Sequence, residues 1–319
     1  MTELAEPIAI GGLQEEMAAK CPFSDETVGV DSVEGENIAR DDRESAKYQQ
    51  SNNGGVLGTN LANASPGKSG TVGGPCPPPK AKESARQDTR RTRVRVRVPA
   101  TADIAEGVYG FTVAAHHLIP GEASLEPSEL KPFMTKDKTV EVSTNQGNKT
   151  KKLRKHIGYN VNGAHNGVWL PGNYFIRSRT SPIKGKSWSA LGDNAWCLNY
   201  VAAVSMAANG QIHDAHTKYS AAVKDLLNAI AKKLSRHECE ECAKPDINPP
   251  FQIKTRLYNL SGYFRTQVTA LPEAWKRPWF TSDRWRDDAF SGGKPSKQFT
   301  NAYRNAGLVG VTPKPGGGA

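Results

Sequence analysis

The sequence has few of the features that would place a protein in a membrane or in an oxidising compartment. No apolar run approaches the roughly 18 residues of a membrane span. The opening MTELAEPIAIGGLQEEM lacks the basic and apolar regions of a secretory signal. The five cysteines are odd in number and widely spread, unlike a disulfide framework. We therefore expect a protein made in the cytoplasm with no membrane partner, and later export without a signal peptide stays open.

Histidine is also scarce, with seven in 319 residues, yet two stand side by side in AAHHLIPG. Neighbouring side chains of a strand point to opposite faces, so His116 and His117 would normally diverge. A strand end or a turn can bring both to one site, where one imidazole binds a metal and the other accepts a proton. We expect residues 108–119 to form a strand or tight loop that delivers this pair.

Charge divides the chain into an acidic head and a basic remainder. Residues 1–85 hold 7 Lys and Arg against 13 Asp and Glu, which leaves 35 against 19 and net charges of −6 and +16. The head is rich in Gly, Ser, Asn and Pro and lacks hydrophobic periodicity, which predicts disorder over residues 1–88. It is either a plain linker or a delivery segment. The basic remainder favours a polyanionic partner such as nucleic acid, although solvated lysines would give the same count.

Hydrophobic periodicity predicts the main elements of the remainder. Valines alternate with arginines in residues 90–100, as in a charged edge strand. Two amphipathic helices follow, with apolar faces at Tyr219, Val223, Leu226, Leu227, Ile230 and Leu234, and at Ile253, Leu257, Leu260, Phe264 and Val268. The tryptophans of AWKRPWFTSDRW are expected in the core, although stacking on bases is an alternative.

Two further clusters carry candidate site residues. Asn160, Asn162 and Asn166 lie in IGYNVNGAHNGVWLPGN, where they favour tight turns, although an Asn can also orient a catalytic histidine. His213 and His216 stand at the start of the first helix. If that turn is helical, both rings lie near one face and can grip one cation; otherwise they are ordinary polar residues, with Asp214 capping the helix.

A separate pair of cysteines, Cys239 and Cys242 in HECEEC, has the spacing of half a zinc site. The second half is missing, so we expect exposed thiols at a helix end.

Read in order, AAHHLIP, NVNGAHNGVWLPGN and IHDAHTKYSAAV resemble the AHH family of nucleases in the HNH/endonuclease VII superfamily. The family pattern is Ala-His-His before an apolar-apolar-Pro, a loop ending in Asn-Gly and apolar-Leu-Pro, and a closing His-x-x-Tyr. The resemblance covers residues 109–234. Gly163 and His165 depart from it, because the family commonly has acidic residues there.

The resemblance implies an α+β fold, with an HNH-like ββα-metal core inside a mostly helical domain and a disordered N-terminal segment. It makes His117 the general base and His116, His213 and His216 the metal ligands, although His116 and His117 can trade roles. Asn166, together with Asn162, would shape the loop and orient the base. One divalent cation is implied, Mg²⁺ first, with Zn²⁺, Ni²⁺ or Mn²⁺ as alternatives.

On this basis we expect three parts: residues 1–88 as a disordered or delivery segment, residues 89–245 as the nuclease domain and residues 246–319 as a helical extension. The implied function is a metal-dependent DNase used as an antibacterial toxin. Its expected partners are DNA, a cognate immunity protein and a carrier or adaptor of a system such as type VI secretion. It would act in the target-cell cytoplasm. An RNase on the same scaffold and a non-catalytic nucleic-acid-binding protein with a structural metal are the alternatives.

Overall fold

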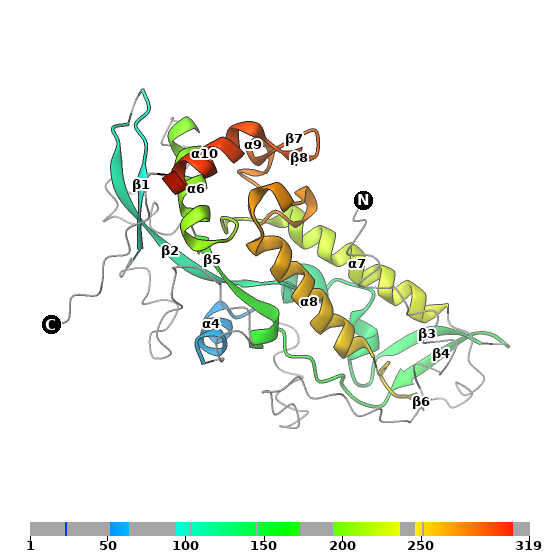
Figure 1. The fold of residues 1–319 in the computed structure, drawn as a ribbon. Helices are drawn as coiled ribbons and strands as arrows, with labels where there is room; N and C mark the ends of the chain where they lie inside the picture. Colours follow the sequence, from blue (N-terminus) through cyan, green and yellow to red (C-terminus); the bar gives the residue numbers. More distant parts are fainter. Residues whose placement is uncertain are drawn as a thin grey trace. The chain divides into compact units, whose positions relative to one another are not determined.

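The computed structural model describes Phe23 and residues 52–63, 94–102, 104–144, 146–172, 194–236, 246–250 and 252–308. These residues form helices and several small sheets, which confirms the α+β class (Figure 1). The chain divides into two compact units. The first comprises Met1–Asn52, Ile119–Asn162 and Ser220–Tyr263, and the second comprises Asn53–Leu118, Gly163–Tyr219 and Phe264–Ala319.

The second unit is built on an antiparallel sheet of three strands. β1 (Val94–Val98), β2 (Gly107–His117) and β5 (Gly167–Gly172) lie in the order β1-β2-β5. Val96 and Val98 of β1 are buried, whereas Arg97 is exposed and pairs with Glu106 at 3.0 Å. The charged edge strand expected from the alternation of valine and arginine is confirmed.

A helix that the sequence did not predict covers part of this sheet. α4 (Gly54–Asn63) lies within the head, which was expected to be disordered, and contacts β2 and β5. Asn53 Oδ1 caps it by accepting from the backbone N–H groups of Gly55 and Val56 at 3.1 and 3.0 Å. Its two leucines, Leu57 and Leu61, are fully buried. The short amphipathic pattern was hidden by flanking Gly, Ser and Asn, so the expectation of disorder was wrong for these residues.

Helices and aromatic side chains form the rest of the second unit's core. α6 (Asn194–Ala208) and α10 (Lys297–Leu308) contact each other, and Tyr200 of α6 donates its hydroxyl to the carbonyl oxygen of Gly110 in β2 at 2.9 Å. The tryptophans expected in the core, Trp275, Trp279 and Trp285, are buried, which confirms that prediction. Short elements connect them: Pro272–Ala274, Arg277–Trp279, α9 (Arg286–Ala289), β7 (Phe290–Ser291) and β8 (Lys294–Pro295).

The first unit carries a smaller sheet with a basic hairpin. Two short turns, Gly121–Leu125 and Lys131–Met134, precede β3 (Thr139–Thr144) and β4 (Gly147–Leu153), and β6 (Asp246–Ile247) pairs in parallel with β4. Residues 136–155 contain six Lys and one Arg against one Asp and one Glu. The hairpin is therefore a concentrated part of the basic charge of the chain.

Both amphipathic helices expected from the sequence are present. α7 is Thr217–Ser235 and α8 is Ile253–Thr269, and every apolar position predicted to face the core is buried. The 3.6-residue period was a sufficient guide here because each helix buries one continuous stripe.

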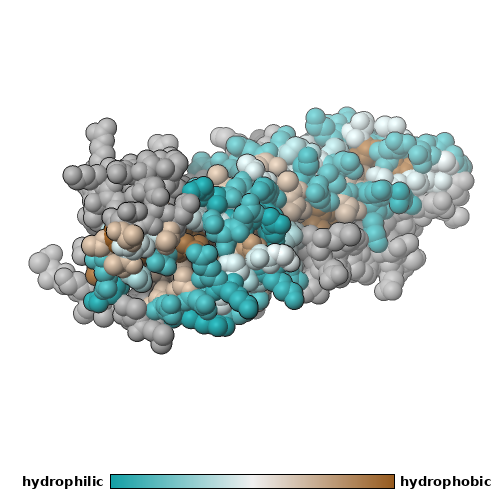
Figure 2. Space-filling view, turned by 90° about the horizontal axis from the view of Figure 1, so that it is seen from above, coloured by the Kyte–Doolittle hydropathy of each residue, from teal (hydrophilic) through white to brown (hydrophobic). Residues whose placement is uncertain are grey.

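The described surface is largely hydrophilic on the face seen in Figure 2, with smaller hydrophobic areas between polar residues. Among the described residues, the exposed large hydrophobic side chains are Val108 and Leu271. In the same residues, no helix is long and apolar enough to cross a membrane. Cys239 and Cys242 lie outside the described residues, as does most of the head.

Candidate metal centre

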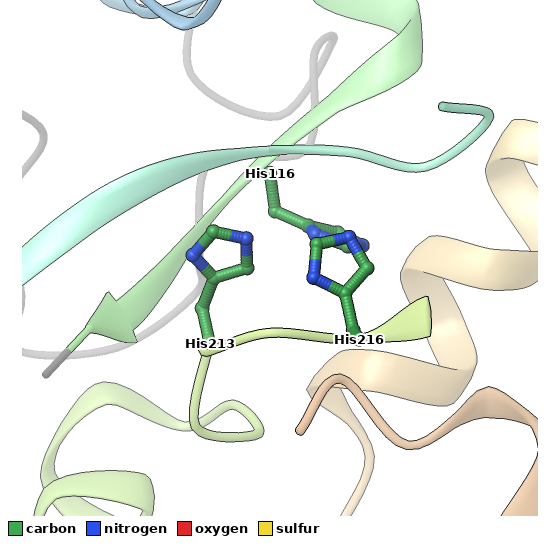
Figure 3. A group of neighbouring side chains, drawn as sticks. All are labelled: His116, His213 and His216. Atoms are coloured by element: carbon green, nitrogen blue, oxygen red, sulfur yellow. The ribbon is translucent and has the colours of Figure 1, made fainter. Parts of the chain in front are cut away.

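The end of β2 delivers the first histidine of the centre. His116 is 1% exposed and lies opposite Val168 in the β2–β5 ladder, while His117, 9% exposed, lies opposite Gly167. The strand thus carries the adjacent pair to its last residues, as the sequence led us to expect. Figure 3 shows the His116 ring directed toward two rings from the chain that leads into α7.

Those two rings belong to His213 and His216, which precede the helix rather than lying in it. α7 begins at Thr217. His213 forms a parallel bridge with Gly172 of β5, and its backbone N–H donates to the carbonyl oxygen of Pro171 at 2.7 Å. The helical first turn considered from the i, i+3 spacing is therefore wrong. A non-helical approach, held against the end of β5, brings the two rings together instead.

The three histidines form one compact group. The ring centroid of His116 lies 5.0 Å from that of His213 and 4.9 Å from that of His216, and the last two are 5.1 Å apart. One ring nitrogen from each can be chosen so that all lie within 4.8 Å of one another. Nitrogens spaced in this way can converge on a single cation.

The hydrogen bonds of the rings show which nitrogens are left for a cation. His216 Nδ1 lies 2.7 Å from the carbonyl oxygen of Asp214, and because a carbonyl only accepts, Nδ1 must carry the proton and Nε2 keeps its lone pair. Within the described part of the chain, both ring nitrogens of His116 and Nδ1 of His213 are buried without a hydrogen-bond partner. Buried polar atoms without partners are costly, and a metal ion would satisfy one nitrogen of each ring.

The surroundings also keep the rings in the neutral form that binds metals. Burial lowers the pKa of His213 to about 3, with smaller contributions from the charges of His216 and His117. Burial likewise lowers the pKa of His116 well below its usual value, and that of His216 is lowered for the same reason. Near neutral pH the rings are therefore uncharged and do not repel a cation.

Two asparagines, Asn166 and Asn162, were expected beside the histidines. The structure places the first beside the end of β2 and the second in the first unit. Asn166 ends a short turn, Ala164–Asn166, just before β5, and its carbonyl oxygen accepts from the N–H of Leu118 at 2.9 Å. It thus faces the end of β2. Asn162 belongs to the first unit, where its backbone N–H donates to Oδ1 of Asn160 at 2.9 Å. The turn role expected for the Asn-rich stretch is confirmed, and orientation of a base by either side chain stays a prediction.

Tyr219 is a neighbour of the metal centre. The hydrophobic periodicity of the sequence had predicted only that this residue lies on the buried face of a helix. Its ring centroid is 5.1 Å from that of His116 and 5.8 Å from that of His216. Its hydroxyl donates to the carbonyl oxygen of Leu118 at 2.6 Å, which ties the first turn of α7 to the chain just after β2. The signal for this role was its position three residues after His216.

Comparison with known protein families shows which family the residues around this histidine group resemble. Residues 102–248 match the AHH family, described as a nuclease family of the HNH/ENDO VII superfamily with conserved AHH. Over these residues the chain is therefore similar to AHH nucleases. No curated protein and no solved structure matches the chain.

The AHH motif is Ala115, His116 and His117, the last three residues of β2. An AHH nuclease hydrolyses phosphodiester bonds, so nucleic acid is its substrate, and nucleases of this superfamily use a divalent metal. Antiparallel β2 and β5 and the later helix α7 come in the order of a ββα-metal core, with β3, β4 and α6 between them along the chain. His165 departs from the family pattern, but its carbonyl oxygen has a structural partner in Nη2 of Arg265 at 2.7 Å.

Proposed function

We propose that the chain is a metal-dependent endonuclease that cleaves DNA, with His116, His213 and His216 as metal ligands. The observation that carries the proposal is the group of three neutral imidazoles, in which ring nitrogens of His116 and His213 are buried without hydrogen-bond partners among the described residues, within the part of the chain that matches the AHH nuclease family. A divalent cation bound there would polarise the phosphodiester and stabilise negative charge on the leaving oxygen.

In this proposal His117 is the general base. It follows a ligand directly on the same strand, and its charge contributes to lowering the pKa of His213, so it lies within electrostatic reach of the centre. A neutral imidazole there can accept a proton from the attacking water. Asn166, beside the end of β2, and Asn162 are proposed to shape the loop that orients this base.

The chemical type of the proposed ligand atoms indicates which metal ion the site prefers. Imidazole nitrogens suit Zn²⁺, Ni²⁺ and related ions, whereas Mg²⁺ prefers oxygen ligands in near-octahedral geometry. Three histidines without a carboxylate among the proposed ligands therefore favour a transition-metal ion over the Mg²⁺ that comes first from the resemblance.

A plasmid assay on the full chain tests the proposal. We expect purified protein to nick supercoiled plasmid with Zn²⁺, Ni²⁺ or Mn²⁺, to lose this activity in excess EDTA and to regain it when the metal is restored. A structured RNA of similar length serves as the parallel substrate. Preferential cleavage of RNA would show that the protein is an RNase rather than a DNase. Cleavage undiminished by EDTA would refute metal dependence.

We further propose that the nuclease is an antibacterial toxin, delivered by a contact-dependent system and blocked by an immunity protein. The resemblance to the toxic ends of polymorphic bacterial toxins supports this role. Expression in a bacterial cytoplasm should arrest growth and degrade the chromosome, and the His117→Ala variant should do neither. Growth arrest without loss of DNA would favour an RNase or a binding protein instead.

A further inference from the structure

The loop that carries two of the proposed ligands lacks a local cap for the helix that follows it. We call residues 211–217 the histidine loop. His216 directly precedes α7, in the position where Ser, Thr, Asp or Asn normally accepts hydrogen bonds from the first turn. Its ring is instead directed at the other histidines, and its Nδ1 donates to Asp214. The Oδ1 of Asp214 accepts from the backbone N–H of Ala215 at 2.9 Å, within the loop and before the helix.

The missing cap comes from Asp283, which lies 66 residues further along the chain. Its Oδ2 accepts from both the backbone N–H and the hydroxyl of Thr217, each at 2.6 Å. Its Oδ1 accepts from the backbone N–H of Lys218 at 3.2 Å. A carboxylate in this place satisfies the exposed donors of α7 and complements the positive end of its dipole.

Asp283 is part of a longer set of contacts, which we call the clamp segment, residues 281–283. The backbone N–H of Asp214 donates to the carbonyl oxygen of Thr281 at 3.1 Å, and the N–H of Asp283 donates to the carbonyl oxygen of Ala215 at 2.7 Å. The Thr281 hydroxyl donates to the carbonyl oxygen of Ile212 at 2.9 Å. The clamp segment therefore runs alongside the histidine loop and bonds it on both sides of His213 and again around His216.

Aromatic contacts from the same part of the chain support the other neighbour of the centre. Tyr219, whose ring touches His116 and His216, lies 6.0 Å from Phe264 and 6.3 Å from Trp279 by ring centroids. Those two rings are themselves 4.9 Å apart. Both, like the clamp segment, lie outside the residues that match the AHH family.

We propose that the clamp segment is an integral part of the metal centre, with Asp283 as the positioning residue that fixes His213 and His216 for the cation. This inference rests on the proposed metal site. The AHH-matching residues supply the ligands, and a segment beyond them holds two of those ligands in place. A ligand supported in this way loses less entropy when the metal binds, so removing the support weakens binding.

Titration calorimetry of the full chain with Zn²⁺ alone tests this. Asp283→Ala should weaken Zn²⁺ affinity by about 10- to 100-fold, as loss of a group that orients metal ligands commonly does. Asp283→Asn, which keeps a capping oxygen, should recover most of the affinity. The matched control is Asp287→Ala, because Asp287 is an exposed acid of the same region whose carboxylate pairs with Arg277 at 2.6 Å; it should bind Zn²⁺ like the parent.

The absorption of bound Co²⁺ is a second readout, because it reports ligand geometry and should change in Asp283→Ala but not in Asp287→Ala. If Asp283→Ala does not fold, the isosteric Thr281→Val replaces it and should weaken affinity roughly threefold to tenfold. Folded variants that bind Zn²⁺ as tightly as the parent would overturn the role of the clamp segment and leave the proposed function standing. A parent protein that binds no metal would overturn both.

Discussion

At the scale of single residues, the adjacent histidines of β2 have separate proposed roles that substitution can distinguish. We expect His117→Ala to cut turnover about 10²- to 10⁴-fold, the usual effect of losing a general base, while Zn²⁺ affinity stays near that of the parent. His116→Ala should lose metal binding as well. Plasmid cleavage and calorimetry on the same preparations check this, and the opposite pattern would exchange the two roles.

The low pKa of His213 makes a prediction about stability. In the unfolded chain this histidine has a pKa near the ordinary value of about 6.5, whereas burial lowers it to about 3 in the folded protein. The unfolded state therefore binds the proton first. Stability should be fully present above about pH 6.5 and decline as pH falls toward 3, by up to about 1.4 kcal/mol per pH unit for this group.

Urea unfolding of metal-free protein between pH 7.5 and 4.5 measures this slope. The matched variant is His213→Asn, which should show a shallower decline because one buried titrating group is gone. Equal slopes in both proteins would mean that His213 is as easily protonated in the folded state as in water.

At the scale of elements, the close approach of α4 to β5 depends on Gly167. A Cβ built at Gly167 would lie 2.6 Å from Cδ1 of Leu57 and 3.0 Å from Cδ1 of Leu61, both buried side chains. Gly167→Ala should therefore displace α4 from the strand that pairs with His117, and we expect loss of stability together with reduced cleavage.

Leu57→Ala tests the same packing from the helix side. Removing a buried leucine typically costs about 2–5 kcal/mol, which denaturant unfolding detects easily. The control is Thr59→Ala, at an exposed position of the same helix. If Leu57→Ala and Thr59→Ala unfold alike, α4 contributes nothing to the stability of the unit.

The basic hairpin β3–β4 is expected to contact the phosphate backbone. Lys149 and Lys155 are exposed, and replacing both by Gln should weaken DNA binding and reduce the slope of log K against log salt by about 0.9 for each phosphate that is no longer neutralised. The control is Lys294→Gln with Lys297→Gln, two exposed lysines at the other unit's β8 and α10. Identical salt slopes in both double variants would mean that the hairpin lysines are merely solvated and do not contact DNA phosphates.

The sequence predicted those elements whose information is local. The valine alternation of β1 and the apolar stripes of α7 and α8 were sufficient, because each pattern repeats over several turns or residues. The metal ligands were predicted from the resemblance to the AHH family rather than from the expected geometry of the elements that carry them. Two features were missed for one physical reason: α4 is short and lies in a polar stretch, and Asp283 acts on residues 66 positions away. The apolar pattern of α4 is too short to stand out from its polar surroundings, and the contact made by Asp283 has no periodic pattern at all.

At the scale of the whole molecule, these distant contacts change what a minimal active fragment must contain. Residues 89–245, the nuclease boundaries expected from the sequence, leave out both α4 and the clamp segment. We expect that fragment to bind Zn²⁺ more weakly than residues 52–308 and to unfold at lower urea concentration. Deleting residues 1–51 should spare cleavage, whereas deleting residues 1–88, the whole segment expected from the sequence to be disordered or to serve delivery, should impair it because α4 is removed. Equal activity of both truncations would show that α4 is dispensable.

The division of the chain into two units carries a consequence for how such a gene can diversify. Each unit is assembled from three separate stretches, so that the chain passes repeatedly from one to the other. A single recombination crossover within residues 53–263 of related genes would therefore give each unit segments from two parents. One unit cannot be exchanged as a single continuous gene segment. We therefore expect variants of this protein to arise by point substitution or by replacement of the entire interleaved region.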